Sequence, residues 1–423
     1  MVADQQQQWE QLAERVSAEL REVWEAATET KSAEELEQAV LEWRGRVGRV
    51  VMEAVCQAVV RERERRQVQV CCGERMDHHS QRGKSVLTLL GAVRVKRRYW
   101  RCLRCGRGAL PGDAWLGWSR GFSWHLEEAV AWECSVVPYR EALESLSKLA
   151  GVELSVLGAE QIVARWGKQK TPVEPYAERV QGDLILQIDG AITPFKEGWK
   201  EAKLACCFDW DRLAPREQQR PQAVSYVADW KTAEEFRETL WEEALARGVT
   251  TARTLAVLGD GAAWIWDTVD HLFPYAVQIL DWYHLTEHLW EAGKAISGEG
   301  KPGTRELVEY WKTEVWEGRS EVVEEHLREY VATGHDDSDH TLRRCADYLQ
   351  THQHRLRYHH FRAMGLPTGS GVVEGACSHV LGLRFKRKST RWTKPGARAV
   401  LHLRLDRING RWDRRCQLTR QAA

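Results

Sequence analysis

The chain contains the stretches DLILQIDG at residues 183–190 and TLAVLGDG at residues 254–261, and these decide its fold. Each contains a short, mostly apolar run, of the length that a buried strand needs, and each ends in an aspartate followed by a glycine. Amphipathic segments of helical length occur at residues 232–247 and 264–272. Strands that alternate with such helices indicate a mixed α/β sheet.

Three further strands complete this sheet in the prediction. In chain order, the predicted strands cover residues 183–189, 200–208, 223–228, 254–258 and 276–280. Three strands, a helix, a strand, a helix and a last strand follow the order of a ribonuclease H-like core. We therefore predict an α/β, ribonuclease H-like catalytic core whose first part spans residues 181–284.

Three carboxylates stand out by their positions in this pattern. Asp189 ends the first predicted strand, Asp260 ends the fourth, and Glu374 lies on a later helix that begins at a Gly-Ser-Gly turn. Carboxylates at neighbouring strand ends share one sheet edge, and carboxylate oxygens suit Mg²⁺. Two such ions, about 4 Å apart, can promote the in-line displacement at a phosphodiester. Any one of these acids alone is more simply a solvated surface residue, but the three together favour a metal-dependent site.

The net charge is zero, with 61 basic and 61 acidic side chains, but the two signs are unevenly distributed. Residues 1–60 carry a net charge of −6 and residues 121–383 one of −15, whereas residues 61–120 carry +10 and residues 384–423 carry +11. Basic blocks are typical of surfaces that bind phosphates. The neutral total therefore does not exclude a nucleic-acid partner.

The N-terminal part is predicted to be a helical region at residues 1–66 followed by a zinc-ribbon-like module at residues 67–110. In this module, two alternating stretches lie between two groups of cysteines, and CLRCG at residues 102–106 matches a zinc knuckle well. The other knuckle is a poorer match because its cysteines are adjacent. The candidate zinc ligands are Cys71, Cys72, Cys102 and Cys105. His78 or His79 completing the set, and a ribbon without metal, are the alternatives.

Basic side chains predict DNA contacts in two places, because phosphate oxygens bind such residues. The first group lies on the second strand of the ribbon and comprises Arg94, Lys96, Arg97 and Arg98. The second follows the Glu374 helix and comprises Arg384, Lys386, Arg387, Lys388 and Arg391. A merely solvated surface has the same composition. Between the two groups, residues 111–180 are predicted to be helical, as a helix-turn-helix or as a plain helical hairpin.

The chain lacks the features of a membrane or exported protein. Its apolar runs are far shorter than the ~20 residues of a membrane span. Its N-terminal residues show neither the basic nor the apolar part of a signal peptide. We therefore expect a cytoplasmic, nucleoid-associated protein whose 11 cysteines are mostly reduced or bound to metal.

Several motifs in combination resemble those of bacterial insertion-sequence transposases with an N-terminal zinc ribbon and a DDE catalytic core, a group related to Mutator-like elements. The resemblance covers most of residues 68–413. The segments that carry it are IDG at 188–190, GDGAAWI at 259–265, DWYH at 281–284, GSGVVEGAC at 369–377, RWTKPGA at 391–397 and GRW at 410–412.

This resemblance implies roles for individual residues. Asp189, Asp260 and Glu374 would be the catalytic triad, holding Mg²⁺ or Mn²⁺, and Asp281 and His284 would be auxiliary. Residues 285–365 would form an all-helical insertion. Residues 366–423 would hold the core helix with Glu374 and the basic tail.

The function implied is that of a DNA transposase. Such an enzyme cleaves the ends of its element and joins the freed 3′-hydroxyls to target DNA. Its partners would be double-stranded DNA, namely terminal inverted repeats and target, and further copies of itself in a homodimer or larger assembly. The alternatives are a domesticated, non-catalytic DNA-binding repressor and a structure-specific DNA nuclease on the same fold.

Overall fold

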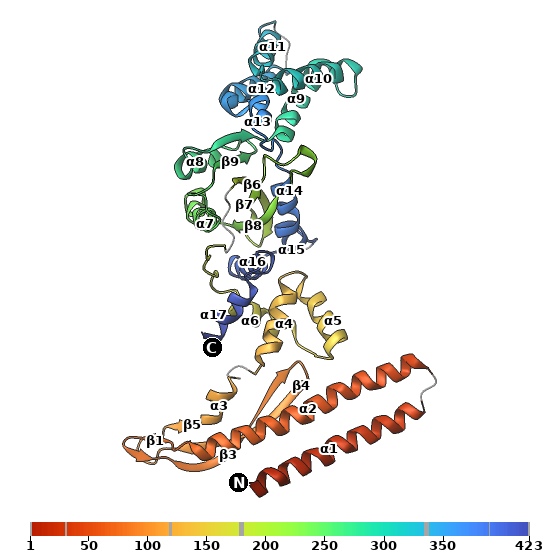
Figure 1. Cartoon of the computed structure of the whole chain (residues 1–423), viewed down its shortest axis with the longest axis vertical. Coiled ribbons are helices and arrows are strands. Elements are labelled where there is room, and N and C mark those ends of the chain that lie inside the picture. Colours follow the sequence, from red (N-terminus) through yellow and green to blue (C-terminus); the bar gives the residue numbers. More distant parts are fainter. Residues whose placement is uncertain are drawn as a thin grey trace. The chain divides into compact units, whose positions relative to one another are not determined.

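The computed structural model describes residues 2–29, 32–117, 121–176, 182–333, 338–388 and 390–421. The predicted domain boundary between residues 180 and 181 lies outside them. The chain divides into two compact units, one formed by residues 1–166 and 416–423 and the other by residues 167–415 (Figure 1). The predicted helical region and the ribbon-like module thus belong to one unit, and the predicted core and insertion to the other.

The first unit begins with two long helices, α1 (Val2–Thr28) and α2 (Ala33–Arg66), which run side by side (Figure 1). The hydroxyl of Ser32 accepts the N–H of Glu35 at 3.1 Å and caps the start of α2. No side chain among residues 6–28 of α1 is buried. The core of this unit therefore begins at α2, whose second half packs on a β-hairpin.

The hairpin consists of β3 (Asp77–Thr88) and β4 (Gly91–Arg101), which pair antiparallel. Its alternation places Val86, Val93 and Val95 against Val60 of α2 in one apolar core. Short strands flank the hairpin and join it to a short helix: β1 (Val70–Cys71), β2 (Glu74–Arg75), β5 (Gly108–Ala109) and α3 (Pro111–Leu116).

Helix α2 also covers the edge of β4. The backbone N–H groups of residues 94, 96 and 98 donate to the side chains of Glu53, Gln57 and Glu64, at 2.9, 2.8 and 2.9 Å. These acceptors lie on one face of α2 because they are four and seven residues apart. An edge strand normally exposes such groups to solvent. Here the side chains of α2 bind them, so the helix and the hairpin are held together by hydrogen bonds as well as by apolar packing.

Three helices follow in the first unit: α4 (Trp124–Cys134), α5 (Tyr139–Ala150) and α6 (Val156–Trp166). Helix α5 ends at Gly151, which has a positive φ of 66°, and Ser155 caps α6 by accepting the N–H of Gly158 at 3.1 Å. The predicted pair of helices at this position is therefore present, with α4 packed against both.

The second unit is built on a five-stranded mixed sheet. In chain order its strands are β6 (Asp183–Phe195), β7 (Gly198–Trp210), β8 (Gln222–Asp229), β9 (Thr254–Gly259) and β10 (Val277–Leu280). Their spatial order is β10-β9-β6-β7-β8. Strands β6, β7 and β8 form antiparallel pairs, whereas β9 is parallel to both β6 and β10. All five predicted strands are present, and the unit is mixed α/β.

Helices cover both faces of this sheet. On one side lie α7 (Ala233–Ala246) and α8 (Ala263–Leu272), and on the other lies α14 (Gly371–Ala376) (Figure 1). Helix α14 continues as a π-helical turn at Cys377–Gly382 and then as α15 (Leu383–Phe385). Two further helices complete the chain, α16 (Lys394–Ile408), which packs on β8, and α17 (Trp412–Gln421).

All the regular secondary structure that is described between β10 and α14 is helical. The helices are α9 (Trp282–Ser297), α10 (Pro302–Trp316), α11 (Ser320–Ala332), α12 (Ser338–His352) and α13 (Tyr358–Ala363). They occupy the position of the predicted insertion, between the last strand of the sheet and the helix that carries Glu374. Among all described helices, none combines the length and the apolar character needed to cross a bilayer.

Candidate functional site

Asp189 and Asp260 lie at one edge of the mixed sheet. Ile188 on β6 is in register with Gly259, the last residue of the parallel strand β9, and in each segment the residue that follows is an aspartate. Asp189 does not end its strand, because β6 continues in its hairpin with β7 as far as Phe195. The prediction of a strand end at Asp189 was therefore wrong. What ends at this point is the neighbouring strand.

The carboxylate of Asp189 is half-buried and has two hydrogen-bond donors. The N–H of Gly190 donates to Oδ1 at 2.6 Å, and the thiol of Cys377 donates to Oδ2 at 3.3 Å. Burial raises the pKa of Asp189, and the negative charge of Asp260 acts in the same direction. A cation beside Asp189 would oppose this shift, so the pair of aspartates favours a positively charged ligand.

Asp260 is held by its own loop. Its Oδ1 accepts the N–H of Ala262 at 2.9 Å, and its backbone carbonyl accepts the hydroxyl of Tyr348 at 3.0 Å. Gly261 has a φ of +91°, a conformation that side-chain-bearing residues rarely adopt. The glycine in the motif thus lets the chain turn sharply after the strand and carry Asp260 at the turn.

Glu374 is exposed on α14, and this helix is fixed to the sheet by Gln187. The side-chain amide of Gln187 donates to the carbonyl of Gly369 at 3.0 Å, and its oxygen accepts the N–H of Val373 at 3.0 Å. Gln187 is 1% exposed and stands two residues before Asp189. We did not select it from the sequence, although a single amide in an otherwise apolar strand was the available signal.

Asp281 is a buried acid that joins both ends of the helical segment. Its Oδ2 accepts the N–H of His284 and caps α9, and its Oδ1 accepts the N–H of Ser370 at 2.7 Å. The hydroxyl of Ser370 in turn donates to Glu374 at 3.0 Å. Burial raises the pKa of Asp281, and the charge of Glu374 acts in the same direction. The imidazole of His284 lies close enough to Asp189 that a positive charge on it lowers the pKa of that carboxyl.

The predicted acids thus gather around one sheet edge, but their oxygens do not converge on one point. Within the described residues, the only group of three or more His, Cys, Asp or Glu ligand atoms that all lie within 4.8 Å of one another is a set of cysteines. In the arrangement seen, Cys377 and Ser370 hold oxygens of Asp189 and Glu374.

The converging set consists of Cys71, Cys72, Cys102 and Cys105, in the first unit. The sulfur of Cys71 lies 3.5 Å from that of Cys105 and 3.9 Å from that of Cys72. Four thiolates around a tetrahedral zinc with Zn–S bonds of about 2.3 Å are ~3.8 Å apart. Two of the sulfur separations are close to this value, and all four sulfurs lie within 4.8 Å of one another, so the cluster could hold a metal ion.

Adjacent cysteines can both take part because the chain turns between them. Cys72 has a φ of 53° and Gly73 one of 83°, so both residues adopt the left-handed conformation. A hydrogen bond from the N–H of Arg107 lowers the pKa of Cys105 to about 7. The two histidine alternatives pack elsewhere: the ring of His78 lies against Trp100 and that of His79 against Tyr99.

The basic residues selected from the sequence divide into exposed and buried ones. Arg97 is 6% exposed and pairs with Asp113, and Arg384 is 2% exposed and lies over the ring of Trp392. These two therefore do not belong to an exposed basic surface, because the alternation of β4 and the packing of α15 turn them inward. The others are exposed or partly exposed: Arg94, Lys96, Arg98, Lys386, Arg387, Lys388 and Arg391.

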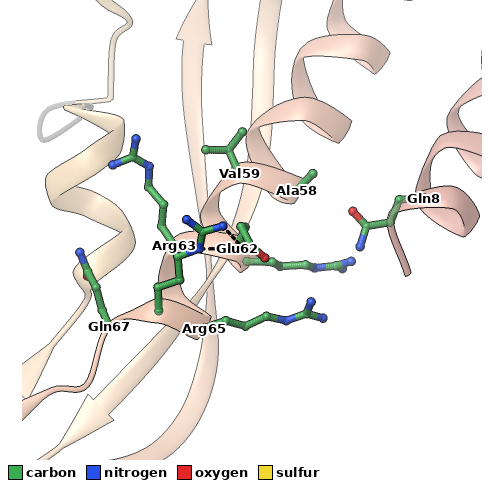
Figure 2. A pocket seen from close by; sticks show the side chains of 9 residues that line it. Gln8, Ala58, Val59, Glu62, Arg63, Arg65 and Gln67 are labelled. Atoms are coloured by element: carbon green, nitrogen blue, oxygen red, sulfur yellow. Dashed lines mark hydrogen bonds and ion pairs between the residues drawn. The ribbon is translucent and has the colours of Figure 1, made fainter. Parts of the chain in front are cut away.

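A further basic surface lies between α1 and the end of α2. It is a groove of about 500 Å³, lined by Gln8 and by the last turns of α2 (Figure 2). Its charged lining consists of Arg61, Glu62, Arg63, Arg65 and Arg66, and Arg66 pairs with Glu62 at 2.8 Å. The positive charge of residues 61–120 thus lies on the end of α2 as well as on the ribbon-like module.

The sequence model of an uncharacterised protein family, UPF0236, matches residues 26–422, and the chain belongs to this family. The match includes all the acids of the sheet edge and all four clustered cysteines. No curated protein matches the chain.

Proposed function

We propose that this member of UPF0236 is a DNA transposase, whose mixed sheet is a ribonuclease H-like core with Asp189, Asp260 and Glu374 as its catalytic acids. The observation that carries the proposal is the register of β6 and β9. It brings Asp189 and Asp260 next to each other at the end of β9, and Gln187 fixes the helix of Glu374 to the strand of Asp189.

The donor set suits Mg²⁺ or Mn²⁺, since all three groups are carboxylates and the pKa of Asp189 is raised by burial beside a second negative charge. When bound, such ions would activate an attacking oxygen and stabilise the leaving oxygen. Cys377 and Ser370 each donate to one carboxylate oxygen, of Asp189 and Glu374 respectively, and these hydrogen bonds would orient the two acids.

The reaction would proceed in two displacements of the same geometry. Water attacks a phosphorus at the element's end, a new P–O bond forms, and the bond to the 3′ oxygen breaks. The attacking water releases a proton, and the leaving oxygen takes one up and becomes a 3′-hydroxyl. The hydroxyl then attacks a phosphodiester of the target, which forms one P–O bond and releases one 3′-hydroxyl. The carboxylates would hold the cations at which the reacting groups are oriented, and no covalent protein–DNA link is required.

DNA would be held by the basic surfaces on either side of this chemistry in the sequence. The positive charge of Lys386 acts against the burial that raises the pKa of Cys377, whose thiol donates to Asp189. The start of the tail after α15 is therefore close to the proposed centre. In the first unit, the cysteine cluster would bind zinc and stabilise the end of the hairpin that carries Arg94 and Lys96. Helices α5 and α6 would add a helix-turn-helix contact, and the bringing together of two element ends implies a homodimer or larger assembly.

The test uses the purified full chain, DNA with the sequences that flank its coding region, and Mg²⁺ or Mn²⁺. We expect cleavage at the repeats and joining of 3′ ends, and we expect Asp260→Asn to abolish both while DNA binding persists. Asp270→Asn, on the exposed side of α8, is the control and should cleave like the unmodified protein. Cleavage without joining would favour a nuclease, and binding without cleavage would favour a repressor.

A further inference from the structure

Two tyrosines of the helical segment reach back to the ends of the parallel strands. The hydroxyl of Tyr348, on α12, donates to the carbonyl of Asp260 at 3.0 Å, just after β9. The hydroxyl of Tyr358, on α13, donates to the carbonyl of Leu280 at 2.9 Å, at the end of β10. The helices between Asp281 and Ser370 therefore contact the sheet edge at the point where the acids lie.

Tyr348 makes the closer approach to a proposed catalytic residue. A Cβ atom on Gly261 would lie 2.4 Å from the tyrosine hydroxyl oxygen, so the glycine is needed for this contact as well as for its positive φ. The turn that presents Asp260 is thus held from two sides. Ala262 binds the carboxylate, and Tyr348 binds the carbonyl of the same residue.

The ring of Tyr348 is itself held in place by two histidines. The ring of His288 lies 4.2 Å away, centroid to centroid, and that of His352 lies 4.7 Å away. Burial lowers the pKa of both imidazoles, so near neutral pH they pack as uncharged rings. Burial also raises the pKa of Tyr348, which keeps its hydroxyl protonated as a donor.

We propose that Tyr348 is a positioning residue for Asp260, and that the helical segment is in this way part of the catalytic centre. The inference rests on the proposed function. Without the hydroxyl, the carbonyl of Asp260 loses its fixed partner, and the turn between β9 and α8 gains freedom. The carboxylate would then be directed less well toward a metal ion. Partners of the ligating side chains themselves change metal affinity or activity by 10–100-fold, and we expect a partner of the backbone at the same residue to act at the lower end of that range.

The experiment compares Tyr348→Phe with Tyr176→Phe in the full chain. Tyr176 donates a comparable hydrogen bond, to Glu243 at 2.8 Å, but away from the acids of the sheet edge. The first measurement is the Mn²⁺ concentration that gives half of the metal-dependent rise in melting temperature, without DNA. Each variant is referred to its own metal-free melting temperature, so a loss of stability does not obscure the result. The second measurement is the rate of DNA cleavage against Mg²⁺ concentration.

For Tyr348→Phe we expect the Mn²⁺ midpoint to rise and the cleavage rate to fall, each by roughly 10-fold. Tyr176→Phe should match the unmodified protein in both. If Tyr348→Phe also matches it while Asp260→Asn is inactive, the positioning role is overturned and the proposed function stands. If Asp260→Asn binds Mn²⁺ and cleaves normally, the proposed function fails, and the inference fails with it.

Discussion

The side-chain oxygen of Gln187 accepts the N–H of Val373 at 3.0 Å, and so joins the first strand of the sheet to a helix that follows 186 residues later in the chain. The other end of the same amide donates to Gly369. One buried side chain thus fixes the helix of Glu374 relative to the strand of Asp189. Two distant parts of the sequence become one sheet edge through this single group.

Replacement of Gln187 should disturb both stability and the proposed site. Gln187→Met keeps the size of the side chain but leaves the N–H of Val373 and the carbonyl of Gly369 without this partner. A buried polar group without a partner costs about 1–3 kcal/mol. We expect a loss of that order in the free energy of unfolding, measured with denaturant, together with reduced cleavage. Gln222→Met, at an exposed position on β8, is the control; equal behaviour of the two variants would contradict the assignment.

The cysteine cluster should bind one zinc ion per chain. Since the left-handed turn at Cys72 brings adjacent thiols to one point, both should be ligands. We expect Cys72→Ser to lose its zinc on dialysis against a chelator that the unmodified protein withstands, as measured by elemental analysis. Cys345→Ala, which removes a buried thiol of the other unit, should keep the metal. Retention of zinc by Cys72→Ser would rule out the adjacent-cysteine site.

The stability of the second unit should fall on mild acidification. Burial, together with the charge of Arg355, lowers the pKa of His352 to about 4, from about 6.5 in the unfolded chain. Between these pH values the imidazole of His352 is protonated in the unfolded chain but not in the folded one. Its contribution to the free energy of unfolding is therefore fully present above pH 6.5 and is lost as the pH falls toward 4. It amounts to about 3 kcal/mol at most.

This pH dependence can be assigned to one group by substitution. His352→Gln should have a flatter plot of melting temperature against pH between 4 and 6.5 than the unmodified protein. His125→Gln, at an exposed position on α4, should not change the plot. Parallel plots for His352→Gln and the unmodified protein would show that another group is responsible.

The tail after α15 should bind DNA through phosphates. Lys386 and Lys388 are exposed, and their reversal in the double variant K386E/K388E should weaken binding to all sequences alike. It should also reduce the slope of log affinity against log salt by roughly one for each lost phosphate contact. The double variant R216E/R220E changes the net charge equally at exposed positions before β8. An identical loss in both variants would indicate only a general effect of charge.

The strands of the sheet could be predicted because their apolar runs are short and bounded by turn residues. Two features of the site could not. Continuation of β6 beyond Asp189 depends on its hairpin with β7, and Gly190 and Pro194 interrupt the apolar pattern that marks the strand in the sequence. The contact of Tyr348 with Asp260 joins residues 88 positions apart, and nothing in the local pattern around Tyr348 indicates it.

The sequence also did not indicate which of the charged residues would be buried. Arg94 and Arg97 stand on the same strand within one basic run, but their side chains alternate, and only Arg97 faces inward to Asp113. The period of two was available, yet charge alone suggested that both were exposed. The adjacent cysteines were predicted as ligands although they match a zinc knuckle poorly, and the positive φ of Cys72, which the sequence does not indicate, is what accompanies their clustering with Cys102 and Cys105.

The side chains of α2 that accept the N–H groups of β4 also determine how the ribbon-like module can meet another molecule. Because Glu53, Gln57 and Glu64 already accept the N–H groups at that edge, and Gln57 donates to the carbonyl of Lys96, a strand from a second chain cannot pair with these groups. Recognition by this strand must therefore occur through side chains such as Arg94 and Lys96. Replacement of these exposed side chains leaves the contacts of the backbone in place, so a change in what the module binds does not require a change in its fold.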